Sequence, residues 1–462
     1  MPPIPPTLGH FGDARRRQVG IDLLSRLMAV GPAGASVRAL AGKRAGEVRF
    51  GRFLANPAVT AAEMGATAAA GTRALAAGRH ILAIQDTTTL RDDGHRTSLN
   101  LHPTIAVDAA TGALLGLIAA TFLARDGAAA AVHCNKRPFA EKESHRWLAA
   151  AEAAASLLPA GAAPQIRAGA AAVTVVGDRE GDIYEDFALR PEGVEVLFRA
   201  HHDRRLADGG SLFACPDRWA ELGRETITLP SAPGRRARTV VLALRAGAVT
   251  LRRPKRNRAA EAAKLPASVT VHLVEAREVS PPAGAEPVLW RLLTSHAVAT
   301  LAEALRITAY YRQRWTIEQV FRTIKTKGFD IEASRVAAGG RFEKLALATL
   351  IAGIAVLSLV RERDGAAGRA LSEMFAAADA PLIAAISAGQ EGRTARQKNP
   401  HPPGSLAYAS WVCARLGGWT GYYGKPGPVV MLAGLLRLEA MIEGMRLGMG
   451  VVAEGDGRGM KP

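Results

Sequence analysis

The chain has 462 residues, enough for two to four domains with a sizeable core. Its 59 Lys and Arg against 42 Asp and Glu give a formal net charge of +17, which predicts a polyanionic partner, nucleic acid before membrane, unless a basic bias unrelated to binding explains it. The three scattered cysteines fit neither a disulfide framework nor metal-ligand spacing, and the first residues do not resemble a signal peptide, so we expect a cytoplasmic protein with no membrane partner.

The first 75 residues are predicted to be helical. An apolar repeat over 22–30 ends at a Gly- and Pro-containing break, then resumes over 37–54 with interleaved arginines and ends before Pro57. Short helices with arginine on their faces are typical of a small DNA-binding module, and a plain helical cap on the main domain fits the pattern equally well.

Two apolar runs that each end in an aspartate follow. Residues 80–85 are predicted to form a buried strand that ends at Asp86, and residues 102–107 and 113–122 complete an antiparallel meander around a turn. After a predicted helix over 141–158, a second apolar run over 171–177 ends at Asp178. Strand, crossover helix and strand make a βαβ unit, whose ligand sites lie at the carboxyl ends of the strands. A single aspartate there is more often a turn residue, but two indicate a site.

Short strands are predicted over 226–229, 239–245, 249–251, 269–276 and 289–294. They form a strand-rich insertion with two basic loops, 235–238 and 252–258, the second of which contains Arg253 and Arg256. Each loop by itself is most simply a solvated loop, but the two together favour a surface that follows a nucleic-acid backbone.

One amphipathic helix is predicted over 310–327. At about 100° per residue, its polar side chains lie within an arc of about 60°, next to an apolar stripe; they are Tyr311, Arg314, Glu318 and Lys325, with Arg322 close beside them. One carboxylate thus stands among cations at the edge of a buried face. An ordinary salt-bridged surface helix is the alternative.

The remaining chain is predicted to be mostly helical. Residues 345–360 form a core helix too short to span a bilayer comfortably. Residues 389–405 read as a linker, residues 406–450 show helical patterns, and the last residues should be disordered.

Asp86, Asp178 and Glu318 together suggest a metal site. Three close carboxylates stay ionised only with cations between them, and oxygen ligands favour Mg²⁺ or Mn²⁺. Two such ions about 4 Å apart activate the attacking oxygen and stabilise the leaving oxygen of a phosphodiester. The neighbouring cations would then bind phosphates, and Tyr311 would donate a hydrogen bond.

The spacing Tyr311-x2-Arg314-x3-Glu318-x6-Lys325 resembles the Y-x2-R-x3-E-x6-K signature of DDE transposases of bacterial insertion sequences, the group called IS four. IQDTTTL and VVGDREGDIYE resemble the two acidic motifs of that family, and FGDARRR, RFGRFLANPAV, EKESHRWLAAAE and ARLGGW resemble further segments. The resemblance therefore extends over most of the chain.

The resemblance implies an α/β fold with an RNase H-like catalytic core. That core would occupy 76–200 and 298–365, interrupted by a β-rich insertion over 201–297. Flanking it would be a helical DNA-binding domain over 1–75 and a helical dimerisation domain over 366–462.

It also implies cut-and-paste transposition by a nucleoid-associated bacterial enzyme, with Asp86, Asp178 and Glu318 as ligands of two Mg²⁺ or Mn²⁺ ions. The partners would be double-stranded DNA, as terminal inverted repeats and target, and a second copy in a homodimer. Trp290 resembles the family tryptophan that stacks on a flipped base, a contact worth about 1–3 kcal/mol, although a strand tryptophan in the core is the alternative.

Some acids compete with these assignments. Asp92 and Asp93 follow Asp86 closely, and Asp182, Glu185 and Asp186 follow Asp178; we prefer Asp86 and Asp178 because each ends a strand. A catalytically silent DNA-binding regulator and a metal-dependent nuclease without strand transfer remain alternative functions.

Overall fold

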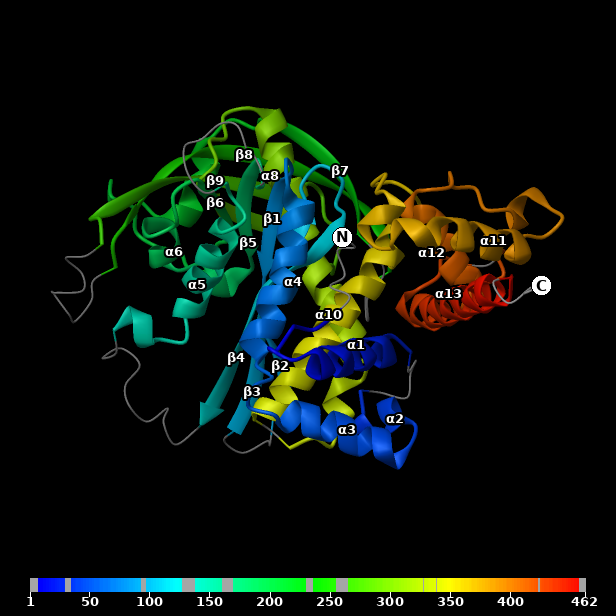
Figure 1. Cartoon of the computed structure of the whole chain (residues 1–462). Coiled ribbons are helices and arrows are strands. Elements are labelled where there is room, and N and C mark those ends of the chain that lie inside the picture. The colour runs from blue at the N-terminus through cyan, green and yellow to red at the C-terminus, as the bar shows by residue number, and fades with distance from the viewer. Residues whose placement is uncertain are drawn as a thin grey trace, which may run out of the picture. The chain divides into compact units, whose positions relative to one another are not determined.

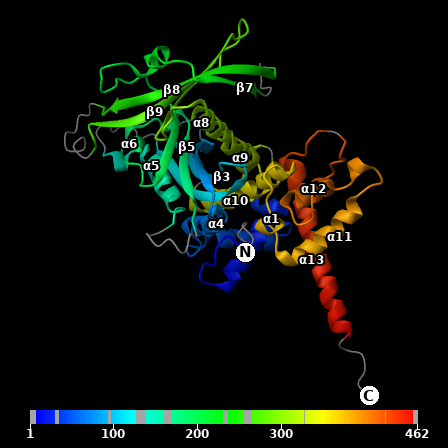
Figure 2. The same ribbon diagram turned by 90° about the horizontal axis from the view of Figure 1, so that it is seen from above.

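The computed structural model describes residues 7–29, 35–92, 97–126, 138–159, 169–229, 236–254, 265–326, 328–337, 339–422 and 424–456. The chain divides into two compact units, which we describe separately. The sheet unit comprises Ala77–Ile105 and Leu123–Ile317, and the helical unit comprises Met1–Ala76, Ala106–Phe122 and Glu318–Pro462. Figures 1 and 2 show the elements of both units from two directions.

The sheet unit is built on one mixed sheet with the strand order β2-β3-β1-β5-β6-β10-β9-β8-β7, and β4 pairs with β3 (Figure 1). The strands are β1 (His80–Gln85), β2 (Thr88–Asp92), β3 (Thr97–Asp108), β4 (Leu114–Asp126), β5 (Ala172–Gly177), β6 (Val194–Arg199), β7 (Gly223–Leu229), β8 (Arg238–Arg252), β9 (Ser268–Glu278) and β10 (Leu289–Thr294). The strands of the predicted insertion continue this sheet, because β10 pairs with β6.

The predicted βαβ unit is confirmed. Strands β1 and β5 pair in parallel, from His80 beside Ala172 to Ile84 beside Val176, and helix α5 (His145–Ala155) packs against β1, β5 and β6. The apolar residues of β1 and β5 are almost entirely buried, which explains why both read as continuous apolar runs. Helix α5 is shorter than predicted, since a separate 3-10 turn covers Phe139–Glu141.

Three strand predictions were incomplete or wrong. Strands β2 and β6 were not predicted at all, and β8 is one strand where two were expected. The predicted interruption contains Gly247, a residue that weakens a strand pattern. In the structure this glycine continues β8 beside the indole of Trp219, which a Cβ at position 247 would approach to 2.6 Å. The glycine therefore marks a close side-chain approach, and the strand continues through it.

The single helix predicted over 310–327 is two helices. Helix α8 (Leu301–Gln313) begins with a capping box formed by Thr300 and Glu303, and helix α9 (Trp315–Lys325) begins after Arg314. At the junction the Arg314 N–H donates to the Tyr311 carbonyl and the Ile317 N–H donates to the Arg314 carbonyl. These three-residue spacings tighten the turn, so the helical arc expected from a continuous helix is interrupted at Arg314.

The helical unit is organised around α10 (Gly340–Glu362), which packs with α1 (Ala14–Ala29), α3 (Arg44–Ala55), α4 (Ala61–Ala76), α12 (Leu406–Leu416) and α13 (Pro428–Asp456) (Figure 1). Two short or peripheral helices, α2 (Val37–Ala41) and α11 (Ala380–Gln390), complete it. Helix α10 is long and apolar enough to span a membrane, but 89% of its most apolar 18-residue stretch is buried inside the structure. Burial in the core therefore accounts for its composition, as predicted.

Polar contacts fix the surroundings of α10. Lys344 donates to the carbonyls of Leu54 and Asn56 at the end of α3. Ser358 donates to the carbonyl of Leu114, in the part of the β3–β4 hairpin that belongs to this unit. The N-terminal helices and the hairpin tip therefore share a core with α10. The final residues, predicted to be disordered, lie outside the described part of the chain from 457 onward.

Candidate active site

Asp86 and Asp178 occupy equivalent positions at the ends of two neighbouring strands. Asp86 follows β1 and Asp178 follows β5, and the parallel register of these strands, extended by two residues, places one beside the other. Since parallel strands end at the same edge of a sheet, both carboxylates stand where ligands bind in sheets of this kind.

Thr87 and Arg314, both within the described residues, donate to the Asp86 carboxylate. Its Oδ1 accepts from the Thr87 N–H at 2.7 Å, and its Oδ2 accepts from the Arg314 guanidinium at 3.1 Å. Both side chains are largely buried, with 16% of the Asp86 side chain and 9% of the Arg314 side chain exposed. The tight turn between α8 and α9 thus delivers a cation to the carboxyl end of β1.

The Asp178 carboxylate holds the next turn of the chain. Its Oδ1 accepts from the Glu180 N–H at 2.8 Å and so caps the short 3-10 helix Arg179–Gly181. Both candidate carboxylates are therefore oriented by a backbone N–H one or two residues further along.

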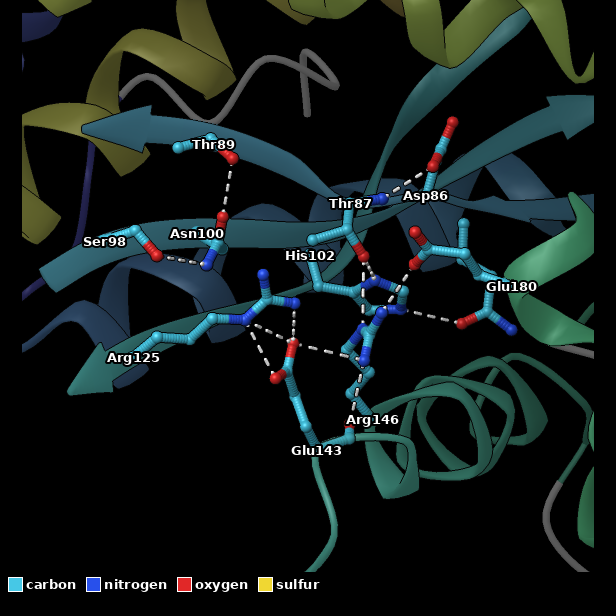
Figure 3. A network of polar contacts seen from close by, with 11 residues as sticks. Asp86, Thr87, Thr89, Ser98, Asn100, His102, Arg125, Glu143, Arg146 and Glu180 are labelled. Carbon is cyan, nitrogen blue, oxygen red and sulfur yellow. Dashed lines mark hydrogen bonds and ion pairs between the residues drawn. The ribbon is translucent and has the colours of Figure 1, made fainter. Parts of the chain in front are cut away.

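Arg146 of α5 contacts Thr87, which follows Asp86, and Glu180, which lies two residues after Asp178; Figure 3 shows both contacts. Its Nε donates to Thr87 Oγ1 at 3.1 Å, and its terminal nitrogens donate to the Glu180 carboxylate at 2.8 Å and to the Glu143 carbonyl at 3.1 Å. The Arg146 side chain is 8% exposed. Arg125, which is half exposed, pairs with Glu143 on the outer side of this network.

His102 lies beneath Thr87 in the same network (Figure 3). Its Nδ1 is 2.9 Å from Thr87 Oγ1, and its Nε2 is 2.9 Å from Gln85 Oε1. Burial, together with the positive charge of Arg146, lowers the pKa of His102 to about 3. The imidazole is therefore neutral at physiological pH.

Aromatic rings lie beside the Arg314 guanidinium. Tyr311 and Trp315 contact it directly, and Trp290 contacts Tyr311. Arg314 lies over the Tyr311 ring at 5.9 Å and over the Trp315 ring at 5.3 Å. Trp290, at the start of β10, meets Tyr311 edge to face with ring centroids 5.8 Å apart. Trp290 is half-buried, unlike a core tryptophan, whereas Tyr311 is almost fully buried.

Glu318, Arg322 and Lys325 belong to the part of α9 in the helical unit, since the boundary between the units falls after Ile317. Their spacing places all three on one side of the helix. Glu318 is half-buried, Arg322 is exposed, and Lys325 pairs with Glu332 at 2.8 Å.

The two predicted basic-loop residues differ in what the structure describes. The Arg253 guanidinium donates to the carbonyl of Leu265 at 2.6 Å, which closes the base of its loop. Arg256 lies outside the described residues.

The acids that competed with Asp86 and Asp178 in the sequence lie elsewhere. Asp182 is buried, accepts from the His201 N–H at 2.7 Å and pairs with Arg204. Asp186 is buried without a hydrogen-bond partner among the described residues, and burial, followed by the nearby Glu185, raises its pKa well above the usual range. Asp92 is exposed at the end of β2, and Asp93 lies outside the described residues.

The chemistry of the strand-end carboxylates fits a divalent cation with oxygen ligands. Both aspartates are ionisable oxygen donors at the same sheet edge, and Asp86 already accepts from a cation. Within the described residues, no three His, Cys, Asp or Glu side chains are gathered in a form that would hold a metal ion. Asp86 and Asp178 therefore offer two oxygen donors, and a complete site requires a further ligand.

Sequence reasoning missed the network around the aspartates. No regular spacing in the sequence identifies the members of this network, because their contacts join separate elements: the turn after β1, β3, α5 and the turn after β5. The members are Thr87, His102, Arg146 and Glu180. The only signal was that EKESHRW, IQDTTTL and VVGDRE, which contain most of these residues, stood out as family-like segments.

Part of the chain is similar to a known protein family. Residues 176–353 match a family described as a transposase DDE domain. The matched segment begins within β5 and contains Asp178, Arg314 and Glu318, whereas Asp86 precedes it. This match, which covers less than half of the chain, supports a DDE transposase.

Proposed function

We propose that this protein is a DNA transposase that moves an insertion sequence by cut-and-paste transposition, with Asp86, Asp178 and Glu318 as its catalytic carboxylates. The observation that carries the proposal is the placement of Asp86 and Asp178 side by side at the carboxyl ends of β1 and β5. The family match over the segment that contains Asp178 and Glu318 supports it.

Asp86 and Asp178 would hold two Mg²⁺ or Mn²⁺ ions together with Glu318. When bound, such ions activate the attacking oxygen and stabilise the leaving oxygen of a phosphodiester. Glu318 is proposed as the further ligand because it follows Arg314 by four residues, and Arg314 donates to Asp86. Thr87 and Glu180 would keep the aspartate oxygens oriented through their backbone N–H groups.

The cations of the signature would bind DNA phosphates. Arg322 is exposed, and Lys325 would exchange its pairing with Glu332 for a phosphate. Arg314 is buried between Asp86 and two aromatic rings, so we assign it to orienting the carboxylate and the scissile phosphate rather than to distant backbone contacts. Tyr311, beneath Arg314, would support that position.

Trp290 is proposed to stack on an extruded base. Its half-buried indole leaves part of the ring accessible, and its edge-to-face contact with Tyr311 fixes the ring. Arg253 and Arg256 would contribute phosphate contacts from a basic loop of the insertion. Arg253 also donates to the Leu265 carbonyl at the base of that loop.

The proposed substrates are the inverted repeats at the ends of the element and a target duplex, and two copies of the chain would act together. The net charge of +17 suits this polyanionic substrate. The Y-x2-R-x3-E-x6-K spacing favours the IS four group, nearest to the transposase of transposon five, and a bacterial cytoplasm as the location.

Cleavage and joining of a labelled element end test the proposal, with the end sequence taken from the inverted repeats that flank the coding region. Wild type should nick and join DNA in Mg²⁺, whereas Glu318→Gln, Asp86→Asn and Asp178→Asn should bind the end but not cut it. Exchange of the exposed Gln319 for Ala, next to Glu318 in α9, serves as a control that should cut normally. Normal cleavage by Glu318→Gln would refute the assignment.

The same assay separates the two other functions. A silent regulator would bind the ends without cutting them even as wild type, and a nuclease would cut without joining. The presence of all three acids favours the transposase over the regulator.

A further inference from the structure

Arg146 occupies a place that the proposed chemistry does not yet explain. It is a nearly buried arginine on α5, and the residues it contacts, Thr87 and Glu180, follow the two candidate metal ligands by one and two positions. Burying a guanidinium is costly unless its donors are used. Here Nε and both terminal nitrogens donate to Thr87, Glu143 and Glu180.

The direction of the hydrogen bonds around Arg146 can be assigned from chemistry alone. An arginine has donors only, so Thr87 Oγ1 accepts from Arg146. Because the Gln85 carbonyl oxygen can only accept, the single proton of the neutral His102 imidazole lies on Nε2, and Nδ1 accepts from the Thr87 hydroxyl. The Nε2–H of His102 then donates to Gln85 Oε1. The Gln85 amide in turn donates to the Trp147 carbonyl at 3.3 Å, next to Arg146 on α5.

This chain of donors starts and ends on α5 and passes through β1, β3 and the turn after β1. It fixes the hydroxyl of Thr87, and the N–H of the same residue orients the Asp86 carboxylate. On the other side, Arg146 fixes the Glu180 carboxylate, and the Glu180 N–H orients the Asp178 carboxylate. One intervening residue, Thr87 or Glu180, thus links Arg146 to each candidate metal ligand.

We propose that Arg146 is a positioning residue that holds the Asp86 and Asp178 turns in one arrangement, so that both carboxylates are presented together to the metal ions. The proposal rests on the proposed function, which supplies the metal. The planar fork of arginine suits this task, because one rigid group reaches Thr87 and Glu180 at once, whereas lysine is a point charge on a flexible stem.

The expected effect is a loss of metal affinity. Residues that orient metal ligands typically change metal affinity or activity by about 10–100-fold when replaced. Arg146→Gln should therefore raise the dissociation constant for Mn²⁺ by this factor. Arg146→Lys should recover only part of it, since a single ammonium cannot reproduce the fork.

Electron paramagnetic resonance of free Mn²⁺ measures this affinity without turnover. The protein is titrated with Mn²⁺ while bound to its element end, and the Asp86→Asn/Asp178→Asn double variant gives the background from other sites. Arg125→Gln is the matched control: this arginine pairs with the same Glu143 but is half exposed, and its hydrogen bonds to described residues go to Glu143 rather than to Thr87 or Glu180, whose charge it meets only at longer range. It should bind Mn²⁺ as wild type does.

A second pair of variants guards against misfolding of Arg146→Gln. Thr87→Val removes the hydroxyl that links Arg146 to His102 but keeps the N–H that holds Asp86, and Thr87→Ser restores the hydroxyl. Weak Mn²⁺ binding by Thr87→Val with recovery in Thr87→Ser would support the proposal. A near-ultraviolet circular dichroism spectrum unchanged from wild type would show that the fold is kept.

The outcomes separate this inference from the proposed function. If wild type binds no more Mn²⁺ than the double aspartate variant, the proposed function fails. If the aspartate variants lose Mn²⁺ while Arg146→Gln and Thr87→Val bind it like wild type, the proposed function stands and the positioning role of Arg146 is wrong.

Discussion

His102 illustrates, at the scale of single residues, how burial decides protonation. The imidazole is buried between Thr87 and Gln85, and Arg146 adds a positive charge nearby, so the pKa of His102 falls from 6.5 to about 3. Between these values the unfolded chain takes up a proton that the folded chain does not. The free energy of unfolding contributed by His102 is therefore retained above about pH 6.5 and decreases as the pH falls towards 3.

Replacement of His102 should change the acid sensitivity of the protein. Below pH 6.5 the residue costs up to about 1.4 kcal/mol of stability per pH unit. His102→Gln should thus be less stable than wild type at pH 7, because two buried hydrogen bonds change, but should lose less further stability on going to pH 5. Urea unfolding at both pH values measures this. Replacement of the exposed His10 by Gln is the control. An equal change in the free energy of unfolding between pH 7 and pH 5 for wild type and His102→Gln would contradict the account.

The residues of the candidate site differ in how far the sequence alone indicated them. Asp86 and Asp178 were predictable because a buried strand that ends in an acid is a local pattern, and two such patterns form a βαβ unit. Arg146 and His102 were not predictable. Arg146 contacts Thr87, 59 positions away along the chain, and His102 contacts Thr87 and Gln85, which are 15 and 17 positions away. Contacts of that kind depend on the order of the strands in the sheet, which the periodic pattern of apolar residues in one sequence does not specify.

At the scale of elements, two predicted boundaries differ from the structure, one within strand β8 and one between helices α8 and α9. Separate strands were predicted over 239–245 and 249–251, but Gly247 lies in a continuous β8, where its lack of a side chain admits the Trp219 indole. Arg314 continued the helical pattern in sequence, but the chain makes a tighter turn there and separates α8 from α9. In both cases tertiary contacts outweighed the local pattern.

Gly247→Ala tests the contact with Trp219. A Cβ at this position would come within 2.6 Å of the indole, and overpacking of this kind typically costs about 1–3 kcal/mol. The same substitution in a Trp219→Leu background should cost clearly less, because the smaller side chain leaves room. Urea unfolding of the four proteins in this double-mutant cycle gives the comparison; equal costs in both backgrounds would show that the indole is not the reason for the glycine.

At the scale of the whole molecule, the fold class was predictable and the extent of the sheet was not. The pattern of residues predicted a βαβ unit and the family resemblance implied an α/β protein, and the structure has a mixed sheet with helices. The sequence suggested a distinct β-rich insertion, yet β7 to β10 extend the same sheet through the pairing of β10 with β6. Strand β6, Val194–Arg199, provides that link, and it was not predicted although it is as long as the predicted strands β1, β5 and β10.

The net charge of +17 predicts DNA binding with a strong dependence on salt. If 6–10 phosphates are contacted, affinity should fall by about 10³–10⁵ between 50 and 200 mM salt. Fluorescence anisotropy of a labelled element end measures the slope. Glu318→Gln should keep the slope of wild type, because it alters a proposed metal ligand rather than a phosphate contact; a binding constant independent of salt would argue against a DNA-binding role for the basic surface.

The most direct test of the central claim is to locate the metal ions themselves. Crystals of the protein bound to its element end, soaked in Mn²⁺, can be measured by anomalous X-ray diffraction. The account predicts two anomalous peaks about 4 Å apart, coordinated by carboxylate oxygens of Asp86, Asp178 and Glu318. Peaks at other acids, such as Asp182 or Asp186, or a pair of ions that Glu318 does not coordinate, would contradict it.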